Sequence, residues 1–126
     1  MEDRKRQGFL TGNSFPLGLV RRRVVIEPRG LEEYRARLAE GGWVSYWGHE
    51  NTLAAAQSVC GHDLRPSVAR PAVTLDADGY PSLGGQSYRE CWVLSGEYEA
   101  GYRPAVGEEV EASRIVRWQV LRMTWE

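Results

Sequence analysis

The chain has 126 residues, with 16 Lys and Arg, 17 Asp and Glu, and a formal net charge of −1. Hydrophobic residues make up 42% of the chain, which excludes wholesale disorder. This length favours a single domain, and the balanced charge argues against a general binder of duplex nucleic acid. No apolar run approaches the roughly 18 residues that cross a membrane, and the charged start MEDRKRQ lacks a signal-peptide core, so we expect a soluble, cytoplasmic protein without membrane contact.

The first half of the chain predicts a flexible leader at residues 1–7 and then alternating strands and helices. Leu31, Tyr34 and Leu38 follow a helical spacing, and the two glycines after residue 40 end that helix. In order, we predict strands at 8–11, 20–27 and 43–47 and helices at 30–40 and 53–60.

The second half predicts further strands around a glycine-rich connection. The Asp78-Gly79 pair between two apolar segments is a hairpin signal. In order, we predict strands at 72–75 and 88–94 joined by a long hairpin at 76–87, an irregular segment at 96–107, one or two helical turns at 108–113 and a strand at 115–125. We therefore expect one α/β (α+β) domain over residues 8–126, with a mixed sheet of five or more strands flanked by helices.

The two cysteines form no CxxC pair. Together with the two histidines they offer four zinc-ligand types, but the spacings of His49, Cys60, His62 and Cys91 match no common zinc pattern. We expect two buried free thiols and no metal.

His49 is the strongest candidate for a catalytic group. It lies between a predicted strand and a predicted helix, where backbone N–H groups and the helix dipole favour an anion. An imidazole with an unperturbed pKa of about 6.5 can give a proton to the leaving oxygen of a phosphate ester near neutral pH, and Gly48 would let a ligand approach closely. The same segment, with Asn51 or Thr52 as the cap, is also typical of a plain helix start.

Charged residues elsewhere are further candidates for ligand contacts. Glu97 and Glu99 lie in a glycine-bounded segment with Arg103 close behind. The arginines at 21–23 and Arg70 would meet phosphates through their planar guanidinium groups, or the triplet would protect a strand edge from aggregation. No GxSxG, HExxH, P-loop or GxGxxG pattern occurs, so the common enzyme signatures are absent.

Two segments of the chain resemble motifs of the small viral anti-CRISPR ring nucleases of type III systems. Phe9-Leu10-Thr11 followed by Asn13-Ser14-Phe15 is similar to the FLTNAFS-like start of that family. Gly48-His49-Glu50-Asn51-Thr52, leading to Ser58-Val59-Cys60-Gly61, is similar to its Gly-His-acidic-polar-Thr turn and the helix end that follows. The resemblance covers residues 8–75 well and the C-terminal third by strand order.

The resemblance implies a homodimer that binds cyclic tetra-adenylate across its two-fold axis and cuts this second messenger without a metal or other cofactor. The ribose 2′-OH would attack the adjacent phosphate, and His49 would protonate the departing 5′-oxygen, leaving linear products with a 2′,3′-cyclic phosphate. This activity would switch off type III CRISPR signalling. The expected substrate-binding residues are Asn13, Ser14, Gly48, Asn51, Thr52, Arg70 and Arg103.

The chain departs from the family pattern in its C-terminal third. The family's Arg-Leu-Glu-Glu-Gly segment aligns with residues 97–101, where the Arg is absent and Ala100 replaces the second Glu. We expect Glu99 to be a catalytic residue and Arg103 to supply the missing cation. The departures also fit a sponge or sensor that binds a cyclic nucleotide without cutting it, and a ligand of another ring size or base. A third interpretation is an interaction protein in which His49 belongs to a helix cap.

Overall fold

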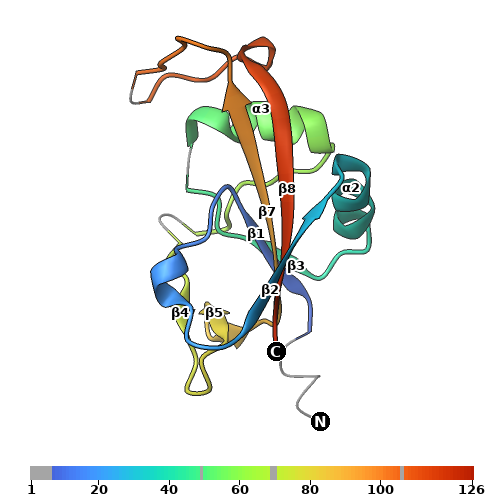
Figure 1. The fold of residues 1–126 in the computed structure, drawn as a ribbon, viewed down its shortest axis with the longest axis vertical. Coiled ribbons are helices and arrows are strands. Elements are labelled where there is room, and N and C mark those ends of the chain that lie inside the picture. The colour runs from blue at the N-terminus through green and yellow to red at the C-terminus, as the bar shows by residue number, and fades with distance from the viewer. Residues whose placement is uncertain (1–6, 49, 69–70, 106) are drawn as a thin grey trace.

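The computed structural model describes residues 7–48, 50–68, 71–105 and 107–126, and these form one α+β domain. Its elements are β1 (Phe9–Gly12), the 3-10 helix η1 (Leu17–Leu19), β2 (Val24–Arg29), α2 (Leu31–Ala39), β3 (Trp43–Ser45), α3 (Glu50–Cys60), β4 (Thr74–Leu75), β5 (Pro81–Leu83), β6 (Gln86–Ser87), β7 (Glu90–Tyr98), the 3-10 helix η2 (Ala112–Arg114) and β8 (Ile115–Trp125). A mixed five-stranded sheet has the order β2-β8-β7-β1-β3, and a small sheet has the order β4-β5-β6 (Figure 1). The predicted fold class is confirmed.

Strand direction brings three chain segments to one edge of the large sheet. β1 pairs in parallel with both β3 and β7, whereas β8 is antiparallel to β2 and β7. The carboxyl ends of β1, β3 and β7 therefore point the same way. In sheets with parallel strands this is the edge at which ligands bind.

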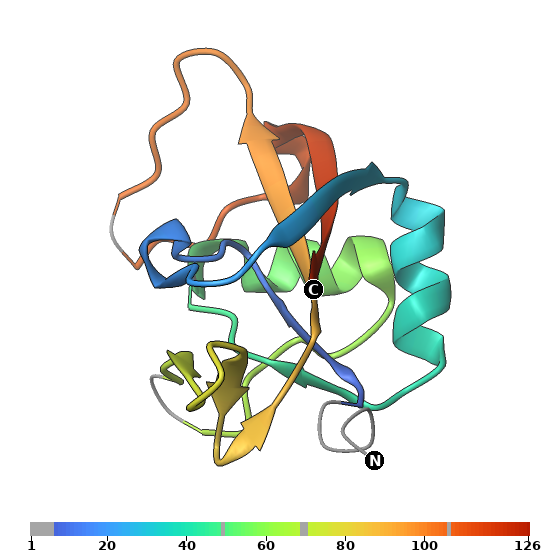
Figure 2. The ribbon, with the colours of Figure 1, turned by 60° about the horizontal axis from the view of Figure 1, so that its bottom comes forward.

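Both α-helices cover the same face of the large sheet. Tyr34 of α2 and Ala56 of α3 pack in one core cluster with Trp92 of β7. The opposite face is partly covered by the small sheet, where Tyr80 packs in a second cluster with Cys91 of β7 (Figures 1 and 2). β7 contributes to both clusters because successive side chains of a strand point to opposite faces.

Helix α2 is fixed to the sheet at the positions that the sequence periodicity indicates. Tyr34 and Leu38 are its buried residues, and the Tyr34 hydroxyl lies 2.5 Å from the Thr11 hydroxyl on β1. The backbone N–H of Gly30 donates to the Glu33 carboxylate at the helix start. These contacts confirm the predicted helix at 30–40 to within a residue at each end.

The predicted long hairpin between residues 72–75 and 88–94 is wrong. β4 pairs with β5 and β5 with β6, so this part of the chain forms its own antiparallel sheet, while β7 pairs with β1 and β8. The local turn prediction holds, since the Asp76 carboxylate accepts the N–H groups of Asp78 and Tyr80. Turn chemistry is local, whereas the choice of strand partner depends on distant segments.

Several predicted boundaries also differ from the structure, among them those of β2, β7 and the segment at 108–113. β2 begins at Val24 and continues through Pro28, which is tolerated because β2 is an edge strand with no donor needed on its outer side. β7 extends to Tyr98, into the segment predicted to be irregular, because it pairs with β8 along its length. The helical turn predicted at 108–113 is the short helix η2 instead.

Some predictions concern features outside the described residues. Residues 1–6 are not described, so the flexible leader stays a prediction. The structure holds a single chain, so the homodimer also stays a prediction. Among the described residues, no helix combines the length and hydropathy that a membrane span requires.

Candidate functional site

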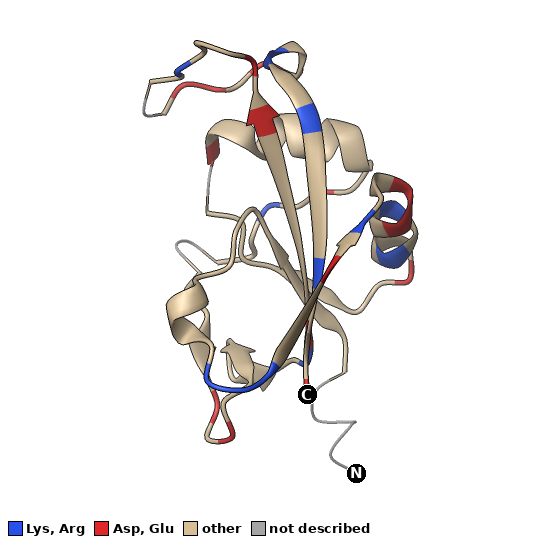
Figure 3. Cartoon of the chain, in the orientation of Figure 1, with Lys and Arg blue, Asp and Glu red and all other residues tan. Residues whose placement is uncertain are grey.

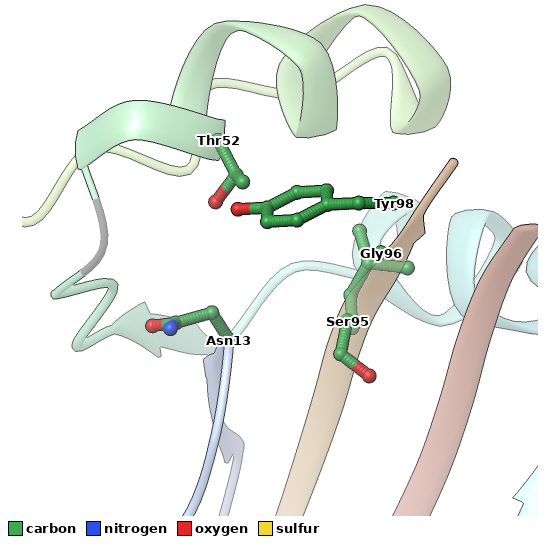
Figure 4. Close-up of a pocket in the computed structure, with 6 residues that line it drawn as sticks. Asn13, Thr52, Ser95, Gly96 and Tyr98 are labelled. Carbon is green, nitrogen blue, oxygen red and sulfur yellow. The ribbon is translucent and has the colours of Figure 1, made fainter. Parts of the chain in front are cut away.

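A hollow of about 250 Å³ lies where β1 and β7 approach the start of α3 (Figure 4). Asn13 directly follows β1, Thr52 lies in the first turn of α3, and the remaining lining residues belong to β7. The lining residues are Asn13, Thr52, Leu94, Ser95, Gly96 and Tyr98. The hollow therefore lies at the carboxyl ends of the parallel strands β1 and β7, the position at which ligands bind in many α/β sheets.

The loop from β3 to α3 is held against the end of β1 by hydrogen bonds. The Asn13 side-chain oxygen accepts the N–H of Gly48 at 3.2 Å, and the Thr11 carbonyl accepts the N–H of Tyr46 at 2.9 Å. The buried Ser45 hydroxyl donates to the Leu64 carbonyl at 2.5 Å. The two sequence motifs, one around Asn13 and one from Gly48 onward, are therefore in direct contact.

Thr52 and Tyr98 face each other across one side of the hollow. Their hydroxyl groups point toward one another in Figure 4, and the Thr52 residue is only 6% exposed. The Ser95 hydroxyl points away from this pair, so Ser95 lines the hollow with its backbone (Figure 4). Polar groups thus meet at the start of α3, where the first N–H groups of a helix have no acceptor within the helix itself.

Tyr98 is placed by an irregularity in the β7–β8 pairing. Glu97 pairs with Arg117 and Tyr98 with Ile115, so β8 has one extra residue, Val116, at this bulge-like shift in register. A bulge re-aims a side chain relative to regular pleating and is frequent beside functional sites. The Tyr98 ring packs edge-on against Tyr102, with centroids 5.6 Å apart.

Sequence reasoning missed the four β7 residues that line the hollow, Leu94, Ser95, Gly96 and Tyr98. The chain was expected to be irregular after residue 95 because glycine and proline recur there. One signal pointed the other way: the predicted strand at 115–125 spans eleven residues. A long, alternating strand needs a partner of similar length, and only an extension of the 88–94 strand supplies one.

Asn51 is engaged with the segment that links β7 to β8. Its side-chain N–H groups donate to the carbonyls of Ala105, at 3.0 Å, and Glu108. Its own carbonyl accepts the N–H of Val110 at 2.6 Å, and Val110 is 1% exposed against Ala55 of α3. In the structure Asn51 thus ties the 99–114 segment to α3, and it does not line the hollow.

The other predicted site residues that the structure describes, Ser14, Gly48, Glu99 and Arg103, are not among those that line the hollow. Glu99 forms an ion pair with Arg114, and its N–H donates to the Arg114 carbonyl. Arg103 is exposed and donates to the carbonyl of Tyr102 at 2.9 Å. Ser14, next to Asn13, is exposed.

His49 and Arg70 lie outside the described residues, so their predicted roles remain predictions. His62 is half-buried, with its ring edge-on to Trp43 at 6.3 Å. Both cysteines are free and buried, as predicted, and burial raises the pKa of each thiol. Over the described residues, no group of three or more potential ligands is placed to hold a metal ion.

A second, charged depression of about 580 Å³ lies between α2 and the β7–β8 strands. Its centre is Glu90, with a side chain 14% exposed, which accepts hydrogen bonds from Arg37, Trp92 and Arg122. Burial by itself would raise the pKa of Glu90, but the hydrogen bonds from Arg37 and Trp92 and the charges of Arg37 and Arg122 outweigh it and lower the pKa. Figure 3 shows that α2 carries both signs of charge, whereas α3 carries an acidic residue at its start and is otherwise uncharged.

Comparison with known proteins gives a match at the level of fold. No protein-family model matches the sequence, and no curated protein matches it. Among solved structures, the chain is similar to B116 of Sulfolobus turreted icosahedral virus, with a TM-score of 0.59 and 14% sequence identity. The match covers 94% of this chain and 99% of B116, so the two proteins share a fold over essentially their whole length.

Proposed function

We propose that this protein is a metal-independent ring nuclease that cleaves a cyclic oligoadenylate, with cyclic tetra-adenylate as the expected substrate, and so switches off type III CRISPR signalling. The observation that carries the proposal is the contact between Asn13 and Gly48 beside Thr52. These residues come from the two segments that resemble the ring-nuclease motifs. The similarity of the fold to B116, a virus protein, supports a role for this protein in virus infection.

The proposed reaction is a transesterification within the substrate. The ribose 2′-oxygen forms a bond to the adjacent phosphorus and loses its proton to solvent, while the bond from phosphorus to the 5′-oxygen breaks. His49 gives its proton to that 5′-oxygen, and the product carries a 2′,3′-cyclic phosphate. Alignment of the 2′-oxygen with the leaving oxygen supplies much of the rate enhancement, because the reacting groups are already held in position and lose little further entropy on reaching the transition state.

The start of α3 suits the charge that develops on the phosphate. α3 has 11 residues, and Thr52 in its first turn lines the hollow. The first N–H groups of a helix have no partner within the helix and carry partial positive charge. Donors fixed before the reaction stabilise the phosphorane at no further cost of reorganisation.

The size of the hollow supports a substrate shared by two copies of the chain. Sites for a single drug-sized ligand have volumes of about 300–1,000 Å³, whereas this hollow measures about 250 Å³. It therefore has room for about one nucleoside and not for a ring of four nucleotides. Two copies related by a two-fold axis would each accept one part of the ring.

A second candidate function is binding without cleavage. Glu99, the expected second catalytic residue, is paired with Arg114 and does not line the hollow. Arg103 donates to a neighbouring carbonyl. A protein with these two groups held elsewhere would act as a sponge or sensor for the same messenger.

The deciding experiment is incubation with labelled cyclic tetra-adenylate in the presence of EDTA. Cleavage by the wild type to products with a 2′,3′-cyclic phosphate, and its loss in His49→Ala, supports the nuclease. Saturable binding of ligand that stays intact supports the sponge. If neither is seen with any cyclic oligoadenylate, both candidates are rejected; a monomer on size-exclusion chromatography in the presence of the ligand rejects the shared site.

A further inference from the structure

The described residues that line the hollow are uncharged. None of these described lining residues has a side chain that is charged at neutral pH. The charged residue nearest to Thr52 along the described part of α3 is Glu50, which is absent from the lining. A phosphate group favours guanidinium or ammonium partners, so this lining suits a neutral part of a nucleotide.

One wall of the hollow is an aromatic ring. Tyr98 extends from the end of β7 across the hollow toward Thr52 (Figure 4). Aromatic side chains are the common platform on which proteins stack unpaired bases, because every base has an aromatic face. Asn13 also lines the hollow, and its amide oxygen accepts the Gly48 N–H while its N–H groups are hydrogen-bond donors.

The Tyr98 ring is supported from behind. Its edge packs on Tyr102 at 87°, and the Arg114 guanidinium lies 5.1 Å from the centre of the Tyr102 ring. Arg114 is in turn paired with Glu99. This chain of contacts fixes the ring before a ligand arrives, which lowers the entropy lost on binding.

We propose that Tyr98 is the base-contacting residue of the hollow, which holds one purine base of the ligand while the phosphates lie outside it. The inference rests on the proposed function, since it assigns a part of the cyclic oligoadenylate to this site. It gives Tyr98 a specificity role and gives Glu99 and Arg114 a positioning role through Tyr102. The sequence position of Tyr98 corresponds to Leu in the family pattern, so this contact would be particular to the present chain.

The test compares Tyr98→Leu, Tyr98→Phe and Tyr102→Leu with the wild type, using fluorescently labelled cyclic tetra-adenylate and cyclic tetra-uridylate. Tyr98→Leu is expected to raise the Kd for the adenylate ring by about 5- to 150-fold, the range of one lost base–aromatic stack. Tyr98→Phe keeps the ring and should bind within about 3-fold of the wild type. Tyr102→Leu disturbs the packing behind Tyr98 without removing the platform, so its loss should be clearly smaller.

The ratio of the two Kd values separates recognition from stability. The wild type should prefer the adenylate ring, because a purine offers the larger face for stacking, and Tyr98→Leu should reduce that preference. An unchanged preference in Tyr98→Leu, or equal losses in Tyr98→Leu and Tyr102→Leu, overturns the assignment of Tyr98 while leaving the proposed function in place. Failure of the wild type to bind either ring instead overturns the proposed function.

Discussion

The carbonyl of Asn51 in the first turn of α3 accepts a hydrogen bond from the N–H of Val110 at 2.6 Å. This bond joins the helix that begins at the hollow to the long segment between β7 and β8. Because Thr52 lies on α3 and Tyr98 directly precedes this segment, the geometry of the hollow depends on how firmly the segment is held.

Replacing the Asn51 side chain is expected to loosen this attachment. Asn51→Ala removes the side-chain donors to the Ala105 and Glu108 carbonyls, and it should lower the free energy of unfolding by about 1–2 kcal/mol. Urea denaturation measures this loss, and hydrogen exchange at the Val110 amide should become faster. Ser58→Ala, at an exposed position of the same helix, is the matched control and should change neither quantity. Slow exchange at Val110 in Asn51→Ala would contradict the tethering role.

The Glu90 cluster predicts a particular pH dependence of stability. The folded pKa of Glu90 is lower than its ordinary value, so the carboxylate stabilises the fold above the unfolded pKa of about 4.3. That contribution is lost as the pH falls through the folded pKa. Glu90→Gln should therefore cost about 2 kcal/mol at neutral pH, and its difference from the wild type should shrink below about pH 4.

Urea titrations between about pH 3 and pH 7 check this prediction. Glu97→Gln is the control, because Glu97 forms an ion pair with Arg117 that is more than half exposed on both sides. An exposed pair contributes little, so this variant should differ from the wild type by less than about 0.5 kcal/mol. A Glu90→Gln deficit that stays constant with pH would show that packing, and not charge, explains the loss.

Gly8 is expected to be intolerant of any side chain. Its φ is +83°, and a Cβ there would lie 2.1 Å from the Gly42 carbonyl oxygen, a backbone atom next to β3. Gly101 has nearly the same φ, +82°, with no atom within 4 Å of its Cβ position. Gly8→Ala should therefore lose about 3 kcal/mol or more of stability, against about 1 kcal/mol for Gly101→Ala. Thermal denaturation distinguishes the two; equal losses would mean that φ strain alone matters at Gly8.

The two thiols are expected to be unreactive in the folded protein. Cys91 is fully buried beside the Tyr46 hydroxyl at 3.1 Å, and burial raises its pKa to about 12. The thiolate is the reactive form, so iodoacetamide at about pH 8 should label neither Cys91 nor Cys60 until the protein is unfolded. Mass spectrometry before and after denaturant checks this. Rapid labelling of Cys91 in the native state would show that the core around Tyr46 opens readily.

The positions of the candidate site residues were predicted in part. The segments containing Asn13, Gly48 and Thr52 carry recognisable motifs, and the structure brings them together. The roles expected of Glu99 and Arg103 came from sequence alignment alone. In the structure Glu99 forms an ion pair with Arg114, and Arg103 donates to the Tyr102 carbonyl. Exposed charged groups form such weak pairs with nearby partners, and the sequence alone does not show which partners are near.

By itself, the sequence determined the elements that short-range chemistry controls: the apolar stripe of α2, the helix that becomes α3, the turn at Asp78-Gly79 and the long C-terminal strand. Each depends on periodicity or turn chemistry within about ten residues. Only the tertiary structure decided that residues 74–87 form a separate sheet and that β7 continues to a bulge at Tyr98, because strand partners are chosen by burial and pairing between distant segments. The hollow exists for the same reason: its walls come from three elements that meet only when the sheet has assembled.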